Sequence, residues 1–136
     1  QAGIKEIHRF VALNQLLSSH LASLSYFLNN NSEHFKPVNL EPATDLILDE
    51  LNNAYHQLEH DPGLVVETDN AVLNPVFTHS NNILKKRKEE ISEGFLETET
   101  KKELVATKSI TDQFIFIYSL AKDMSKVSKR IAALVP

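Results

Sequence analysis

A long uncharged stretch constrains the fold of this chain more than any other feature. Residues 10–28, FVALNQLLSSHLASLSYFL, contain no Asp, Glu, Lys or Arg, although 24% of the chain is charged. Apolar residues recur there every three or four positions, which is the spacing of one helix face, and others widen that face. The face consists of Phe10, Leu13, Leu17, Leu21, Leu24 and Leu28, widened by Val11, Leu16 and Phe27. We therefore expect a helix packed on two sides, by other helices or by a partner.

The same stretch approaches the length of a membrane span, which needs about 20 apolar residues. However, its polar side chains would each need a hydrogen-bonding partner inside the hydrocarbon. These side chains are Asn14, Gln15, Ser18, Ser19, His20, Ser23 and Ser25. We therefore expect that this chain does not itself span the membrane.

Length and charge place the chain in a narrow class. Its 136 residues fit one domain, residues 1–136, and the absence of cysteine excludes disulfides and thiolate chemistry. A net charge of −4 argues against a nucleic-acid partner, because phosphate binding relies on clustered cations. The one basic run, residues 85–88, is followed by Glu89 and Glu90, which favours a solvated helix face with ion pairs. Because the sequence begins at Gln1, we expect a soluble piece of a longer protein.

The breaks in the pattern predict four helices and no strands. The first is expected at about 4–29 and ends in an Asn-rich run. The second, at about 40–60, follows Asn39 as its N-cap and ends at Asp61-Pro62-Gly63. The third is expected at about 78–93, after an irregular connection. The last, at about 100–134, opens with a capping box formed by Thr100 and Glu103.

Matched apolar length predicts that the first and last helices pack against each other. The last helix has apolar residues at alternating steps of three and four, which is typical of bundles and coiled coils. We therefore predict an all-α fold, an antiparallel four-helix bundle with two long and two shorter helices. Its core is expected to centre on Phe10, Leu17, Leu21, Leu24, Leu51, Phe114, Ile117, Tyr118 and Leu120.

The residues indicate no catalytic, cofactor or metal site. His56 and His60 share one helix face, but two imidazoles without a third ligand are more typical of a polar helix end. Paired carboxylates in contrasting environments, phosphate loops and nucleophile motifs are absent from the sequence. Asn14, Asp112 and Gln113 lie on or beside the expected helix contacts, where polar residues set register. We therefore expect a protein that is not an enzyme.

Two segments resemble a known family. Residues 4–28, IKEIHRFVALNQLLSSHLASLSYFL, and residues 108–126, KSITDQFIFIYSLAKDMSK, are similar to the C-terminal cytoplasmic region of the FUSC family. These are bacterial inner-membrane proteins of the fusaric acid resistance and YccS-like type. The resemblance implies a parent with transmembrane helices before this domain and a role in aromatic-acid efflux. It places this chain at the cytoplasmic face of the inner membrane and transfers no transport residue to it.

Two kinds of function remain open. The first is an interaction or regulatory domain that associates with itself or with other regions of the parent. Its surface is expected at apolar residues beside the main stripes, namely Leu13, Leu16, Phe27, Ile115 and Phe116. The alternative is a small-molecule sensor that binds an organic anion between helices near His20 and Tyr26. A sensor requires a concave cavity with converging polar groups.

Overall fold

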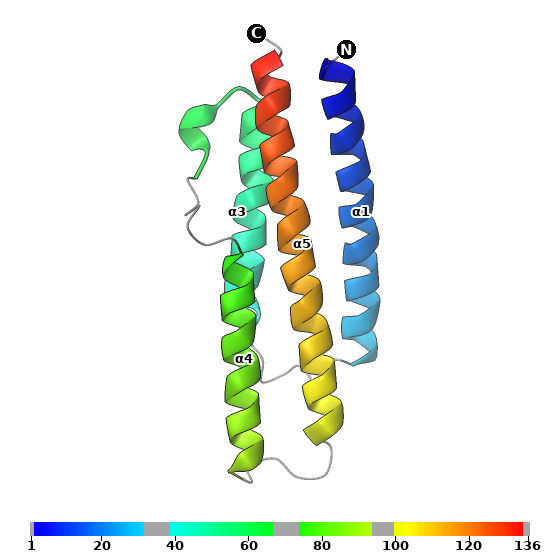
Figure 1. The fold of residues 1–136 in the computed structure, drawn as a ribbon, viewed down its shortest axis with the longest axis vertical. Coiled ribbons are helices and arrows are strands. Elements are labelled where there is room, and N and C mark those ends of the chain that lie inside the picture. Colours follow the sequence, from blue (N-terminus) through cyan, green and yellow to red (C-terminus); the bar gives the residue numbers. More distant parts are fainter. Residues whose placement is uncertain (1, 32–38, 67–73, 94–99, 135–136) are drawn as a thin grey trace.

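The computed structural model describes residues 2–31, 39–66, 74–93 and 100–134, and these ranges are almost entirely helical (Figure 1). They contain four α-helices, a short 3-10 helix and no strand, which confirms the predicted all-α class. The helices are α1 (Ala2–Asn30), α3 (Glu41–Leu58), α4 (Pro75–Ser92) and α5 (Thr100–Leu134), and the 3-10 helix is η1 (Pro62–Leu64). No helix within these ranges has the length and apolar character needed to cross a membrane.

Successive helices run in opposite directions, and α5 occupies the centre of the bundle (Figure 1). The predicted contact between α1 and α5 is confirmed, but α5 packs most extensively against α3, which runs parallel to it, and it also contacts α4. Within the described residues, the Cα atoms of α1 come within 8 Å of those of α5 but of no other helix. The helix α1 is therefore held in the bundle from one side only.

Local side chains define two of the helix ends. At the end of α1, the side-chain amide of Asn31 donates to the Phe27 carbonyl at 2.9 Å, which satisfies a carbonyl of the last turn. At the start of α3, the N-cap is Leu40 and not the predicted Asn39. Asn39 lies one residue before this N-cap. Its side chain still accepts a hydrogen bond from the Glu41 amide at 3.2 Å.

The end of α3 is a Schellman motif. The Asp61 amide donates to the His56 carbonyl at 2.9 Å, and the His60 amide donates to the Gln57 carbonyl at 3.2 Å. This arrangement requires a left-handed residue, and His60 supplies it with a φ of 59°. The helix therefore ends at Leu58, two residues before the predicted boundary.

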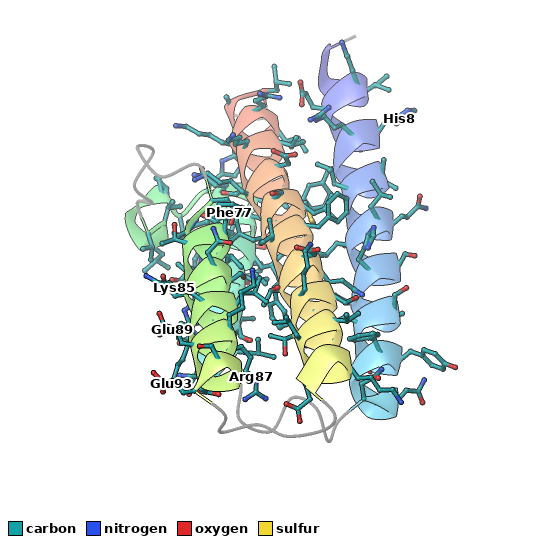
Figure 2. All side chains as sticks on the ribbon, turned by 60° about the horizontal axis from the view of Figure 1, so that its bottom comes forward. His8, Phe77, Lys85, Arg87, Glu89 and Glu93 are labelled. Carbon is teal, nitrogen blue, oxygen red and sulfur yellow. The ribbon has the colours of Figure 1, made fainter. Side chains whose placement is uncertain are left out.

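The helix α4 begins at Pro75, three residues before the predicted start. Asn74 accepts hydrogen bonds from the Val76 and Phe77 amides at 3.1 and 3.2 Å, and proline is favoured in the first turn. In this first turn Val76 is fully buried and Phe77 is exposed. Figure 2 labels Phe77 in this first turn.

The described core agrees with most of the prediction. Leu17, Leu24, Phe114, Ile117, Tyr118 and Leu120 are buried as predicted. Phe10 and Leu51 pack against the core but are only half-buried. Leu21 was predicted wrongly, because it is 43% exposed. The stripe of α1 that faces α5 includes Leu17 and Leu24, and Leu21 lies beside this stripe.

The expected capping box of α5 is described only in part. The side chain of Thr100 lies outside the described residues. The Glu103 carboxylate accepts a hydrogen bond from the Arg87 guanidinium at 3.2 Å, so it links α5 to α4. Arg87 also pairs with Glu90 at 3.1 Å and is buried, which corrects the prediction that the whole 85–88 run is a solvated face. In Figure 2, Arg87 lies on the other side of α4 from Lys85, Glu89 and Glu93.

Candidate interaction surface

The helix α1 carries two parallel stripes, each with helical spacing of three and four residues. We call the first the seam: it faces α5 and consists of Glu6, Phe10, Leu13, Leu17, His20, Leu24 and Phe27. Every residue of the seam is buried or half-buried. Two of its polar members contact α5 directly. The Glu6 carboxylate lies 3.8 Å from the Arg130 guanidinium, and the His20 and Phe116 rings have centroids 4.6 Å apart.

The second stripe has no partner within the described chain. We call it the outer stripe: it consists of Ile4, Ile7, Val11, Asn14, Ser18, Leu21 and Ser25. All seven residues are exposed, and its four large apolar residues are about half exposed. At roughly 100° per residue, this stripe lies about 60–160° around the helix from the middle of the seam. The side of α1 beside the α5 contact is therefore apolar and open.

His8 marks the face of α1 that is farthest from α5. Figure 2 shows its side chain pointing away from the bundle. Nine positions separate His8 from the buried Leu17, which corresponds to roughly half a turn around the helix. The outer stripe lies between the seam and the His8 face, on one flank of α1.

The residues predicted as an interaction surface divide into three groups. Leu13 is 8% exposed and belongs to the core, so it is removed from this surface. Phe27 and Ile115 are half-buried against the core. Leu16 and Phe116 are 47% and 46% exposed. Leu16 lies on the flank of α1 opposite the outer stripe, on the same side of the seam as His20, which touches Phe116. Leu16, His20 and Phe116 thus form a second apolar area, across α1 and α5.

The two residues predicted for a small-molecule site are not brought together. His20 is half-buried against Phe116, whereas Tyr26 is 73% exposed. Six positions on one helix separate them by about 120° around its axis. Their side chains therefore diverge and do not line a common site on α1.

Polar groups inside the bundle connect the other helices. Glu50 of α3 is buried, and its carboxylate accepts a hydrogen bond from the Tyr118 hydroxyl at 3.4 Å. Burial, together with the nearby Glu50 carboxylate, raises the pKa of Tyr118 from 10.0 to about 12, because both disfavour the phenolate. The protonated Tyr118 hydroxyl is therefore the donor of this bond and the Glu50 carboxylate is its acceptor.

A buried amide fixes the connection that follows α3. The Asn53 side chain donates to the Val66 carbonyl and accepts from the Val66 amide, both at 2.8 Å. The sequence predicted an irregular connection before the third helix, and the structure holds its beginning with the Asn53 side chain. Glu50, Asn53 and Arg87 are buried charged or amide side chains that were not predicted from the sequence. The only available signal was the helical spacing that Glu50 shares with Ala43 and Ile47.

The described residues contain no group of three His, Asp or Glu side chains placed to hold a metal ion. The ring of His56 packs edge-on against Tyr55, with centroids 5.3 Å apart, and His60 occupies the exposed end of α3. The exposed apolar residues of α1 are the main candidate for a functional surface among the described residues.

Comparisons with known protein families, with curated proteins and with solved structures find no match to this chain. The similarity of residues 4–28 and 108–126 to the FUSC family therefore rests on those residues alone.

Proposed function

We propose that this chain is a helical interaction and regulatory domain of a FUSC-type bacterial inner-membrane transporter, at the cytoplasmic face of the membrane. The observation that carries the interaction role is the exposed apolar surface of α1, which comprises the outer stripe on one flank and Leu16 on the other. Helices in a bundle normally bury their apolar stripe against neighbours, yet among the described residues α1 contacts α5 alone and leaves large apolar side chains open.

The family assignment is supported by where the two similar segments lie in the fold. Residues 4–28 make up most of α1, and residues 108–126 make up the middle of α5. These helices pack against each other, so the resemblance follows one structural unit. The transport path of such a parent would lie in its membrane part, and this chain would contribute assembly.

The complete gene product provides the test. We expect its sequence to contain apolar segments of about 20 residues before this domain, and we expect the protein to sediment with bacterial inner membranes. A photo-cross-linking residue at Leu16 should then form adducts with the membrane part of the same gene product. His8, which points away from the bundle, is the matched control position and should give fewer adducts.

Two outcomes would overturn this proposal. A gene product without apolar segments of that length would exclude a membrane transporter. Equal adduct yields at Leu16 and His8 would show that the Leu16 flank of α1 has no partner in the gene product.

A further inference from the structure

We infer that the outer stripe of α1 binds the outer stripe of a second copy of this chain, antiparallel, with a two-fold axis at Asn14. The inference rests on the proposed interaction function and names its partner. It concerns the flank of α1 that lies opposite Leu16.

The spacing of the outer stripe is that of a second helix contact. Its residues follow one another at steps of three and four from Ile4 to Ser25, which is the pattern by which one helix contacts another along its length. The seam has the same pattern and is occupied by α5. Within the described chain no helix occupies the outer stripe, although Ile4, Ile7 and Val11 are each about half exposed.

The absence of charge favours an identical neutral surface as the occupant. The outer stripe contains no charged residue, and residues 10–28 contain none on any face. A partner that presented Lys, Arg, Asp or Glu to this surface would bury those charges without counter-charges, which is strongly unfavourable. A second copy of the stripe presents only apolar and small neutral groups.

The stripe is complementary to itself when it runs antiparallel. Around a two-fold axis at Asn14, Ile7 lies opposite Leu21 of the second copy, and the two Asn14 amides meet on the axis. Val11 lies within one residue of the level of Ser18, and Ile4 lies within one residue of the level of Ser25. Large side chains thus face small ones at two levels, which allows close approach of the helices. The two Asn14 side chains can each donate and accept one hydrogen bond.

The helix dipoles favour the antiparallel orientation, because the two dipoles then point in opposite directions.

The size of the contact predicts a weak dimer. The stripe extends over residues 4–25, roughly 33 Å of helix. A single pair of helices of this length lies near the low end of specific interfaces, about 1,200 Å² in total. We therefore expect association in the micromolar range and not an obligate dimer.

Single-cysteine variants test this inference, because the native chain has no cysteine. In the 136-residue chain, Asn14→Cys places a thiol on the axis, and Ser23→Cys places one about half a turn away around α1. Both positions are exposed, so both variants should retain the native circular dichroism spectrum. At high micromolar concentration under mild oxidation, Asn14→Cys should form the disulfide-linked dimer at least about tenfold faster, because association raises the effective thiol concentration.

A mixture of variants tests the orientation. Ile7→Cys and Leu21→Cys should cross-link with each other when mixed, whereas Ile7→Cys alone should cross-link slowly, because its two thiols would be separated by roughly 21 Å along the axis. Fast cross-linking of Ile7→Cys with itself would overturn the antiparallel arrangement. Equal rates for Asn14→Cys and Ser23→Cys would overturn the dimer itself. Such equal rates would exclude the dimer but not the proposed function, provided that the complete gene product associates with the membrane and forms adducts at Leu16.

Discussion

At the scale of single residues, burial on α1 follows position relative to α5 and not hydropathy. Leu17 and Leu21 are identical side chains one turn apart, yet Leu17 is buried and Leu21 is exposed. The sequence could not separate them, because apolar residues cover so much of α1 that several rotations of the helix would bury a continuous stripe. The contacts with α5, including Glu6 with Arg130 and His20 with Phe116, fix the rotation.

Alanine substitutions at these two residues should have unequal effects. Leu17→Ala should lower the free energy of unfolding by about 2–5 kcal/mol, because it leaves a cavity in the core. Leu21→Ala should lower it by only about 0.5 kcal/mol, as for a surface substitution. Urea denaturation at low protein concentration, where association is negligible, measures both values. Similar losses of unfolding free energy for the two variants would show that Leu17 is not more deeply buried against α5 than Leu21.

The Tyr118 hydroxyl provides a prediction about pH. Its pKa is raised from 10.0 to about 12 in the folded state. The stabilisation of the folded state that comes from keeping this hydroxyl protonated is therefore complete below pH 10 and is lost as the pH rises to about 12. Within that window the unfolded state loses the proton first, and the free energy of unfolding should fall by about 1.4 kcal/mol per pH unit from this group. Tyr118→Phe should lack this component, which denaturation at several pH values would reveal. Identical pH dependence in both proteins would contradict the assignment.

At the scale of elements, the sequence predicted the type and number of helices well and their ends less well. The boundaries of α5 agree with the prediction, because its apolar pattern is sustained for its whole length. The start of α4 was missed by three residues because the Asn74-Pro75 pair was taken as part of a loop. Asn74 also donates to the Ile115 carbonyl at 3.1 Å, a contact with α5 that no local pattern contains.

His60, the residue with left-handed backbone conformation at the end of α3, leads to a prediction about stability. His60 is the non-glycine residue with positive φ among those described, and a side chain in this conformation costs roughly 1–2 kcal/mol. His60→Gly relieves that cost but adds freedom to the unfolded chain, so we expect a net gain of about 0.5–1 kcal/mol. Thermal denaturation measures the gain. His60→Ala, which keeps a β-carbon, is the control and should give no gain; equal stabilisation by both variants would show that backbone strain is not the cause.

At the scale of the whole molecule, the contact of α1 with α5 was predictable and the contact of α3 with α5 was not. The first follows from two long apolar helices of matched length. The second depends on buried polar groups, such as Glu50 with Tyr118, whose partners lie far apart in the sequence. Of the residues predicted as an interaction surface, Leu13 belongs to the core, and that prediction did not include the exposed outer stripe through Ile7 and Val11.

The central claim is that α1 has one side occupied by α5 and another available to a second copy. Sedimentation equilibrium of the 136-residue chain over a range of concentrations tests it most directly, with Ile7→Lys and Leu16→Lys as matched variants on opposite flanks. Both side chains are about half exposed, so both variants should fold. We predict a reversible monomer–dimer equilibrium in the micromolar range for the native chain and for Leu16→Lys, and a loss of association of at least about tenfold for Ile7→Lys, equivalent to about 1.4 kcal/mol. A native chain that stays monomeric at every concentration, or an Ile7→Lys variant that associates as strongly as the native chain, would contradict the claim.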